Sequence, residues 1–260
     1  MTVLIFDTET TDREPGREII EVAWIEIRGA EDLAGDNPDA IERHLMPAAF
    51  FEQRYQPSKP CTFGALAVHH ILPEELEGMP PASSFRLPAD VQYLCGHSVD
   101  FDWEAIGKPD VKRICTCAMA KALWPKAESH SQSALLYMLE GPTRATRHML
   151  KDAHSAAADV ANNLILLGHI LAAKPEITTW SALHAFSEEA RIPTIMFMGR
   201  NKGEPITSLE SGEIDWYLAR DFIDPYQRLA LEREMKRRRS VYTTGDYDEE
   251  EEEDDCDVDF

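Results

Sequence analysis

An apolar run that ends directly in acidic residues opens this chain. Residues 3–6 read VLIF, and residues 7–10 read DTET. A short run of large apolar side chains predicts a strand that is buried on both faces, because each face then needs a packing partner. Asp7 and Glu9 are two residues apart, so on a strand both side chains lie on one face. The sequence therefore predicts a buried strand that presents two carboxylates at its end.

Two adjacent buried carboxylates need a compensating positive charge. When both are ionised, their burial costs several kcal/mol. The hard cations Mg²⁺ and Mn²⁺ prefer oxygen ligands and are the usual solution in proteins. The alternative is that Asp7 and Glu9 mark only a polar strand end or the start of a hairpin. For this D-x-E motif taken by itself, the alternative is the simpler interpretation.

Further apolar and periodic segments predict an α/β order of elements. Strands are expected at residues 19–27, 43–46 and 91–95, and helices at residues 62–70, 114–124, 131–139 and 152–171. The last helix is the clearest, because it is rich in Ala and Leu and ends before Pro175. Strands come first and helices then alternate with strands, which predicts an α/β layered domain over residues 1–175.

The rest of the chain is expected to divide into three parts. Residues 176–192 are interpreted as a connector that could contain a helix of its own. Residues 193–240 are expected to form a small α+β module, with a strand at 195–198, a glycine-flanked turn and two helices. Residues 241–260 are expected to be a disordered acidic tail, because like charges repel and few apolar side chains can be buried there.

The net charge of −21 does not exclude a nucleic-acid partner. Eleven acidic residues and no Lys or Arg lie between Asp246 and Phe260, which leaves −10 for the first 245 residues. Some of that remainder belongs to carboxylates that a metal site would need. The charge of the whole chain is therefore a poor guide to what its folded part binds.

Cysteine usage and the apolar segments favour a cytoplasmic protein. The five cysteines are odd in number and lie mostly among apolar residues, as expected of buried thiols in a reducing compartment. Cys115 and Cys117 lack a second pair at zinc-site spacing. We identify no secretory signal, and the longest apolar stretch, residues 164–173, is too short to span a bilayer.

Two later segments add candidate site residues. Asp100 and Asp102 follow the expected strand 91–95, and spacing alone does not choose between them. A carboxylate that stabilises a helix N-terminus is the alternative there. His154 and Asp159 are five residues apart on the expected helix 152–171, with small alanines between them. A histidine satisfied by its neighbours near a helix N-terminus is the alternative interpretation of His154.

Taken together, these motifs resemble those of the DEDDh exonucleases, the DnaQ-like branch of the ribonuclease-H-like fold. The order is D-x-E on a first strand, D after a later strand and H-x-x-x-x-D on a helix, and the resemblance covers residues 3–172. GHSVDFD resembles the family's [A/G]-H-N-x-x-F-D, with Ser98 in place of Asn, and points to Asp102. ALAVHHI resembles a family segment near the 3′-terminal nucleotide and points to His69. ICTCAMAKALWP and SQSAL resemble the corresponding helices, with Gln132 where Asn is common.

The resemblance implies a ribonuclease-H-like mixed sheet flanked by helices and a site with two Mg²⁺ or Mn²⁺ ions. The four carboxylates that it implies as metal ligands are Asp7, Glu9, Asp102 and Asp159, with Asp7 bridging the ions and Asp102 acting through water. His154 would be the general base. The residues expected to contact the terminal nucleotide are Thr8, Thr10, Leu66, His69 and Phe101. For Leu66 and Phe101, ordinary packing is an equal alternative.

The implied function is 3′→5′ exonuclease activity on DNA with a free 3′ end, single-stranded or frayed, releasing nucleoside 5′-monophosphates. An enzyme that trims RNA or degrades oligoribonucleotides is one alternative, because discrimination rests on 2′-OH contacts that sequence does not show. A non-catalytic nucleic-acid-binding module is another, although all five residues of the expected catalytic set are present.

Two C-terminal motifs carry weaker resemblances. GRNKG at 199–203, followed by Ile206, Leu209 and Trp216, resembles a small F-G-K-x-K-G domain of such enzymes, with Met198 in place of Phe. The end of the chain, EEEEEDDCDVDF, resembles the acidic tips of bacterial single-stranded-DNA-binding proteins, with Asp259 where Pro is usual. A protein partner for this tail is therefore one hypothesis. The others are a solvating tail and a tail that competes with nucleic-acid phosphates.

Overall fold

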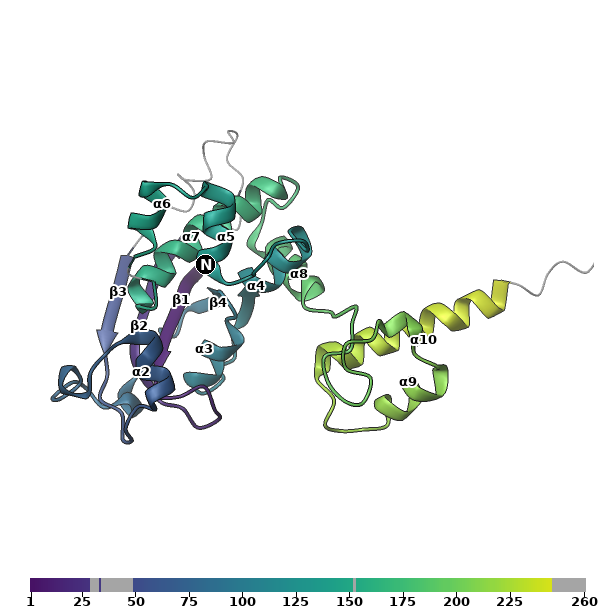
Figure 1. The fold of residues 1–260 in the computed structure, drawn as a ribbon, viewed down its shortest axis with the longest axis horizontal. Coiled ribbons are helices and arrows are strands. Elements are labelled where there is room, and N and C mark those ends of the chain that lie inside the picture. Colours follow the sequence, from purple (N-terminus) through teal and green to yellow (C-terminus); the bar gives the residue numbers. More distant parts are fainter. Residues whose placement is uncertain (29–32, 34–48, 152, 245–260) are drawn as a thin grey trace, which may run out of the picture. The chain divides into compact units, whose positions relative to one another are not determined.

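Two compact units make up the chain. The computed structural model describes residues 1–28, 33, 49–151 and 153–244. The first unit is Met1–Ala190, and the second begins at Arg191 (Figure 1). The first unit contains the predicted α/β domain and all the candidate site residues.

A five-stranded mixed sheet forms the centre of the first unit, in the order β3-β2-β1-β4-β5 (Figure 1). Its strands are β1 (Thr2–Thr10), β2 (Ile19–Arg28), β3 (Ala49–Arg54), β4 (Val91–Gly96) and β5 (Lys112–Cys115). β1 lies in the middle, antiparallel to β2 and parallel to β4. β3 is antiparallel to β2, and β5 is parallel to β4. The α/β class with a mixed sheet is thus confirmed.

Both edge strands escaped the sequence analysis. β3 carries Glu52, Gln53 and Arg54 and is largely exposed or half-buried, so it lacks the apolar pattern of a central strand. β5 has four residues and leads directly into a helix, so residues 114 and 115 were assigned to the helix instead. The strand predicted at 43–46 lies outside the described residues.

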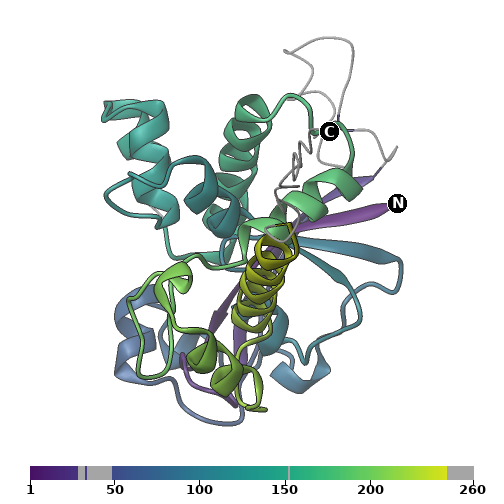
Figure 2. The same ribbon diagram turned by 90° about the vertical axis from the view of Figure 1, so that its right-hand side faces the viewer.

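One face of the sheet is covered by a layer of helices around α7 (Ala156–Ala173), which packs on β1 and β2. The other helices of this layer are α4 (Thr116–Leu123), α5 (Gln132–Glu140), α6 (Arg144–Met149) and α8 (Trp180–Ala190). Figure 2 shows α7 between the sheet and the pair α5 and α6. Val3 and Ile5 are fully buried on this face and belong to the same core as Leu166 and Leu167. Asp7 and Glu9 continue this odd-numbered face of β1.

The opposite face packs against α3 (Asp100–Ala105) and the segment around Phe85. Leu4 and Phe6 are buried there together with Trp24, whose ring stacks on that of Phe51 with centroids 3.8 Å apart. α2 (Phe63–His69) follows β3 along the chain, and Thr62 caps it as predicted, accepting a hydrogen bond from the Ala65 N–H. Short 3₁₀ turns lie at Pro73–Glu75, Ala82–Ser84 and Ile206–Ser208.

The helix α7 begins four residues later than predicted. Ser155 is its N-cap, and its hydroxyl accepts a hydrogen bond from the N–H of Ala158. His154 has a φ of 72°, which a helix does not allow. His154 therefore lies on the loop before the helix, not on the helix itself. By length and composition alone, α7 is long and apolar enough to span a membrane. Its packing against the sheet accounts for that apolar character.

The second unit has its own apolar core beneath two helices, α9 (Ser211–Leu218) and α10 (Pro225–Thr244). The two helices agree with the sequence analysis, but the strand predicted at 195–198 does not form. Within the described residues that segment makes only an isolated bridge between Ile195 and Pro205. α10 also extends four residues past the expected end of the module at 240. The remainder of the predicted tail, residues 245–260, lies outside the described residues.

The segment interpreted as a connector belongs mostly to the first unit. α8 occupies much of residues 176–192, and its Trp180 and Leu183 are buried in the core of the first unit. The Ser187 hydroxyl accepts a 2.8 Å hydrogen bond from the N–H of Cys115 at the end of β5. The apolar face of α8 covers an edge of the sheet, which is why the first unit continues to Ala190.

Candidate active site

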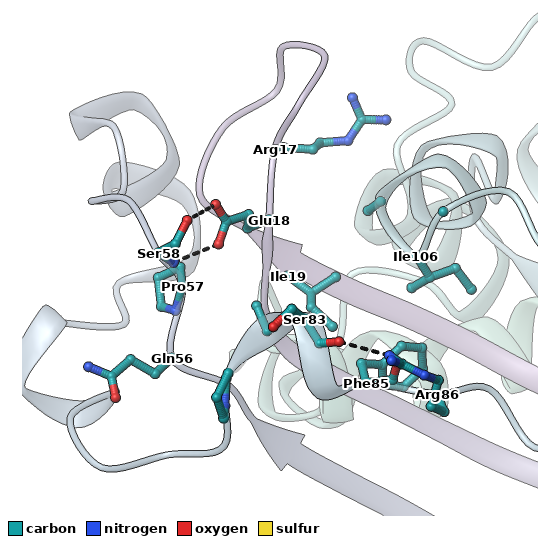
Figure 3. A pocket seen from close by; sticks show the side chains of 14 residues that line it. Arg17, Glu18, Ile19, Gln56, Pro57, Ser58, Ser83, Phe85, Arg86 and Ile106 are labelled. Carbon is teal, nitrogen blue, oxygen red and sulfur yellow. Dashed lines mark hydrogen bonds between the residues drawn. The ribbon is translucent and has the colours of Figure 1, made fainter.

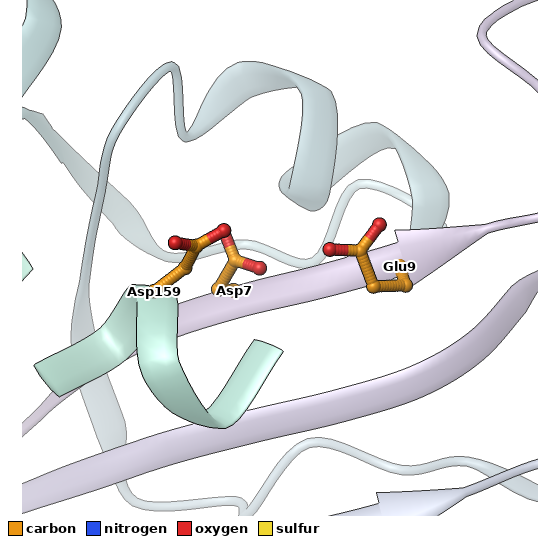
Figure 4. A group of neighbouring side chains, drawn as sticks. All are labelled: Asp7, Glu9 and Asp159. Atoms are coloured by element: carbon orange, nitrogen blue, oxygen red, sulfur yellow. The ribbon is translucent and has the colours of Figure 1, made fainter. Parts of the chain in front are cut away.

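Three carboxylates meet where β1 passes the first turn of α7 (Figure 4). One oxygen of each of Asp7, Glu9 and Asp159 lies within 4.8 Å of the others. Asp7 and Glu9 share a face of β1 because they are two residues apart, and Asp159 reaches them from the helix packed on that face. The sheet and helix together create the proximity, since Asp159 is far from the other two in sequence.

Burial and mutual repulsion raise the pKa of each member of this group. The pKa of Asp7 is raised well above its usual value, first by burial and then by the charges of Asp102 and Asp159. Burial, followed by the charge of Asp159, raises the pKa of Glu9 to about 9. Burial also raises the pKa of Asp159, and the neighbouring His154 opposes that shift. In the absence of a cation, burial and the neighbouring charges therefore oppose ionisation of every member of the group.

Such a donor set fits a divalent metal ion. Three carboxylate groups supply oxygen ligands, which Mg²⁺ and Mn²⁺ prefer. A divalent cation would relieve the repulsion that raises the pKa of these groups. The residues that could hold such an ion directly are Asp7, Glu9 and Asp159.

Asp102 lies beside this group but does not belong to it. It is 3% exposed on α3, and its Oδ1 accepts hydrogen bonds from Thr8, from the N–H at 3.0 Å and the hydroxyl at 2.7 Å. Burial raises the pKa of Asp102 to about 7, and the two Thr8 hydrogen bonds oppose that shift. Asp100, the competing residue, instead pairs with Arg113. The two aspartates, which spacing alone does not distinguish, thus have different partners in the structure.

His154 is exposed on the loop that precedes α7. Its backbone N–H points to Asp159 Oδ2 at 3.3 Å, so the loop is tied to the carboxylate group. The left-handed backbone of His154 is uncommon for a residue other than glycine, and such conformations often occur at functional sites. A second histidine, His97, is fixed between the Thr116 hydroxyl and the His130 carbonyl.

The five residues expected to contact nucleotide lie in different environments. Thr8 is engaged with Asp102, and the Thr10 hydroxyl donates to the carbonyl of Asp12 at 2.7 Å. Phe101 lies under the guanidinium of Arg17, 4.0 Å from it, and Leu66 is half-buried on α2. These contacts favour packing or positioning roles for several members of the set.

His69 differs from the other four. It is buried, and its Nδ1 accepts a 2.9 Å hydrogen bond from the N–H of Ile71. Nε2 must then carry the proton, yet this buried donor has no partner among the described residues. Burial lowers the pKa of His69, which favours the neutral ring that this acceptor role of Nδ1 requires. A buried, unused donor is costly unless a ligand accepts from it.

Glu21 is the residue that the sequence analysis missed. It is 1% exposed on β2, directly opposite Glu9 in the strand register. One carboxylate oxygen accepts from Arg54 at 3.0 Å, and the other accepts from the backbone N–H of Ala156 at 2.9 Å. The sequence does contain a signal for Glu21, because an acidic residue within the otherwise apolar run IIEVAWI is expected to be buried and to need a partner.

Comparison with solved structures identifies the architecture. A structure described as exonuclease X in complex with 5′ overhanging duplex DNA matches 72% of this chain and 98% of its own, at a TM-score of 0.51 and 18% identity. The chain shares the fold of exonuclease X. The motif spacing of this sequence resembles that of exonuclease X as well. No family model matches the sequence, and no curated protein matches it.

Two further structures have lower TM-scores than exonuclease X. An E. coli ExoI–ssDNA complex in a zinc-bound form scores 0.47 at 18% identity and matches 67% of this chain and 41% of its own. The nuclease domain of 3′hExo, described as a DEDDh family member bound to rAMP, scores 0.44 at 12% identity and matches 66% and 92%.

The exonuclease X fold of this chain also contains a pocket of about 570 Å³ apart from the carboxylates (Figure 3). Its apolar lining includes Ile19, Phe85 and Ile106, near the α3 face of the sheet. Glu18 lies at its rim and accepts two hydrogen bonds from Ser58, which lower the pKa of Glu18 against the opposing effect of burial. None of the candidate site residues lines this pocket.

Proposed function

We propose that this protein is a metal-dependent 3′→5′ exonuclease of the DEDDh type. The observation that carries the proposal is the meeting of Asp7, Glu9 and Asp159 within 4.8 Å, with buried Asp102 beside them. The shared fold with exonuclease X supports it. Three half-buried carboxylates beside the buried Asp102 would destabilise a protein that had no use for them.

The carboxylates would hold two divalent ions between them. Asp7, Glu9 and Asp159 would bind one ion directly, and Asp7 would share the second, with Asp102 acting through water. The bound ions would supply an activated water and stabilise charge on the phosphate and on the leaving 3′-oxygen. Thr8 fixes the orientation of Asp102 with two hydrogen bonds, so it is a positioning residue in this proposal.

His154 would act as the general base. Its ring is on an exposed loop, so it can reach water at the edge of the carboxylate group. The hydrogen bond between its N–H and Asp159 keeps the loop near that group. An imidazole titrates near neutrality and can accept the proton of the attacking water.

His69 would bind the terminal nucleotide. Its unused Nε2–H donor can satisfy an oxygen of the terminal sugar or phosphate, which explains why a buried donor is kept without a protein partner. The charge of Glu21 acts on His69, and Glu21 lies opposite Glu9, so His69 is near the carboxylates.

We propose DNA as the substrate, in the form of a free 3′ end that is single-stranded or frayed. The complex of exonuclease X with DNA supports this choice. RNA remains the alternative substrate, because the same carboxylates serve both polymers and the 2′-OH contacts decide between them.

The test is digestion of matched DNA and RNA oligonucleotides that carry a 5′ label. With Mg²⁺ or Mn²⁺ we expect a ladder that shortens from the 3′ end, release of nucleoside 5′-monophosphates, and no reaction with chelator. A 3′-terminal phosphate should slow the reaction, and Asp7→Asn should abolish it. Asp110→Asn, which changes an exposed carboxylate outside the site, is the matched control. Cleavage of a closed circle, shortening from the 5′ end or full activity of Asp7→Asn would contradict the proposal.

A further inference from the structure

The second unit carries an exposed tryptophan beside two arginines. Trp216 on α9 is 42% exposed, although indole rings are usually well buried. The guanidinium of Arg220 lies over its ring, 4.4 Å from the centroid, and that of Arg200 lies 5.8 Å away. Its ring lies perpendicular to that of Tyr217, which is buried, with the two centroids 5.1 Å apart. The core therefore anchors one side of Trp216 and leaves the rest available at the surface.

The turn before α9 carries two basic side chains, Arg200 and Lys202, and Arg200 lies near this ring. Gly199 has a φ of 79°, and a Cβ there would lie 2.6 Å from the Tyr217 hydroxyl, so only glycine fits. Asn201 is buried and exchanges two hydrogen bonds with Tyr217, at 3.2 Å and 3.0 Å. Arg200 and Lys202, on either side of Asn201, are exposed. The motif GRNKG is thus an anchored turn that presents two cations to solvent.

The charge of the second unit differs from that of the first. Residues 191–244 contain ten basic residues (Lys and Arg) and eight acidic residues (Asp and Glu). Residues 1–190 contain sixteen basic and twenty-eight acidic residues. Near the tryptophan, Arg200 pairs with Glu213 at 3.0 Å. Within the described part of the chain, neither Arg220 nor Lys202 forms an ion pair. Because Asp215 and Asp221 are close in sequence, charge alone would bind a polyanion weakly, and most of the affinity must come from the ring.

We propose that Trp216, with Arg200 and Arg220, forms a stacking platform for a base of a single-stranded nucleic acid. Aromatic rings bind unpaired bases through their π-faces, and arginines beside them contribute cation–π and phosphate contacts. Arg220 holds the ring in the free protein and moves to a phosphate when a base replaces it. This inference rests on the proposed function only in taking a nucleic acid as the ligand. Binding to the platform requires neither the metal nor the carboxylates.

The test measures binding of the full chain to fluorescent strands in the presence of chelator, which prevents hydrolysis. Two strands of equal length and charge are compared, oligo-dT and an abasic strand. Trp216→Ala should weaken oligo-dT binding roughly tenfold to a hundredfold, as expected for loss of one stacked base. It should leave binding of the abasic strand unchanged, and Trp216→Phe should retain most of the oligo-dT affinity.

Lys236→Ala is the matched control, because it removes an exposed charge on α10 outside the tryptophan cluster. It should change the binding of both strands by a similar, small factor. Equal oligo-dT binding by wild type and Trp216→Ala would overturn the proposal, as would a wild type that binds neither strand. Equal binding is also the outcome expected if Trp216 contacts a protein partner instead.

Hydrolysis of a dinucleotide tests the proposed function without the platform, because a dinucleotide is too short to reach beyond the carboxylate site. Trp216→Ala should hydrolyse it at the wild-type rate, while the KM for oligo-dT rises. If the wild type hydrolyses neither substrate but the difference in oligo-dT binding persists, the proposed function fails and the platform stands. If Trp216→Ala and Trp216→Phe both lose dinucleotide hydrolysis and thermal stability, the role of Trp216 is structural and the platform is overturned.

Discussion

The carboxylate of Glu21 on β2 accepts a 2.9 Å hydrogen bond from the backbone N–H of Ala156, the first residue of α7. The N-terminus of a helix has unpaired N–H groups and a partial positive charge, so a buried carboxylate is favourable there. Through its second oxygen Glu21 also binds Arg54 of β3. Glu21 thus fixes the start of the helix that carries Asp159 against the sheet, next to the strand β1 that carries Asp7 and Glu9.

Replacement of Glu21 should impair both stability and activity. Glu21→Ala should lower the free energy of unfolding by about 2–4 kcal/mol, because it leaves a buried N–H and an arginine without their acceptor. It should also reduce kcat, whereas Glu21→Gln, which keeps an acceptor for Ala156, should recover most of the rate. Glu75→Ala removes the other, more exposed partner of Arg54 and should lower the stability far less, because solvent screens an exposed ion pair. Equal effects of Glu21→Ala and Glu75→Ala would contradict this positioning role.

The raised pKa of Glu9 predicts a stability that depends on pH when metal is absent. The pKa rises from 4.5 to about 9 on folding, so between these values the folded state binds more protons than the unfolded chain. The free energy of unfolding should therefore fall as pH rises through this range. Glu9→Gln should raise the Tm at pH 8 in chelator and change it little at pH 4.

A bound metal ion should remove the destabilising effect of the Glu9 charge. Mg²⁺ or Mn²⁺ should raise the Tm of the wild type but hardly that of Glu9→Gln, because ligands bound only by the native state stabilise it. Glu9→Gln should have almost no nuclease activity. Calorimetric unfolding scans at several pH values, with and without metal, measure these effects. A Glu9→Gln variant that is less stable than the wild type in chelator at pH 8 would show that Glu9 is not repelled by its neighbours.

His154 should be required for chemistry and not for folding. His154→Asn is the informative variant, because asparagine tolerates the left-handed backbone at φ 72° but cannot act as a base near neutrality. We expect the rate to fall by roughly 10²–10⁴. The pH–rate profile should lose its acidic limb, and the Tm should change little because the side chain is exposed. An unchanged profile would assign His154 a structural role.

Deletion of residues 246–260 removes eleven acidic side chains and should distinguish the three hypotheses for the tail. If the tail competes with phosphate, DNA affinity should rise at low salt and converge with the full-length value at high salt. If it binds a protein, DNA affinity should stay constant and Phe260→Ala should abolish partner binding. If only solubility falls, the tail is a solvating segment. Salt-dependent binding curves distinguish these outcomes.

Local patterns in the sequence were sufficient for the central elements. VLIF predicted the buried strand β1, and the two-residue spacing of Asp7 and Glu9 placed them on one face, as a strand requires. Local sequence also predicted helices at residues 62–70, 131–139 and 152–171, the last of them rich in Ala and Leu. These features depend only on neighbours in the chain, so sequence alone can specify them.

The structure decided what depends on residues distant in sequence. The edge strands β3 and β5 lack a strong local pattern because they gain their stability from pairing with β2 and β4. The Thr8 hydrogen bonds join Asp102 of α3 to β1, and the role of Glu21 required the start of α7 beside it. Burial, pairing and capping across the sheet set these outcomes, and no local spacing encodes them.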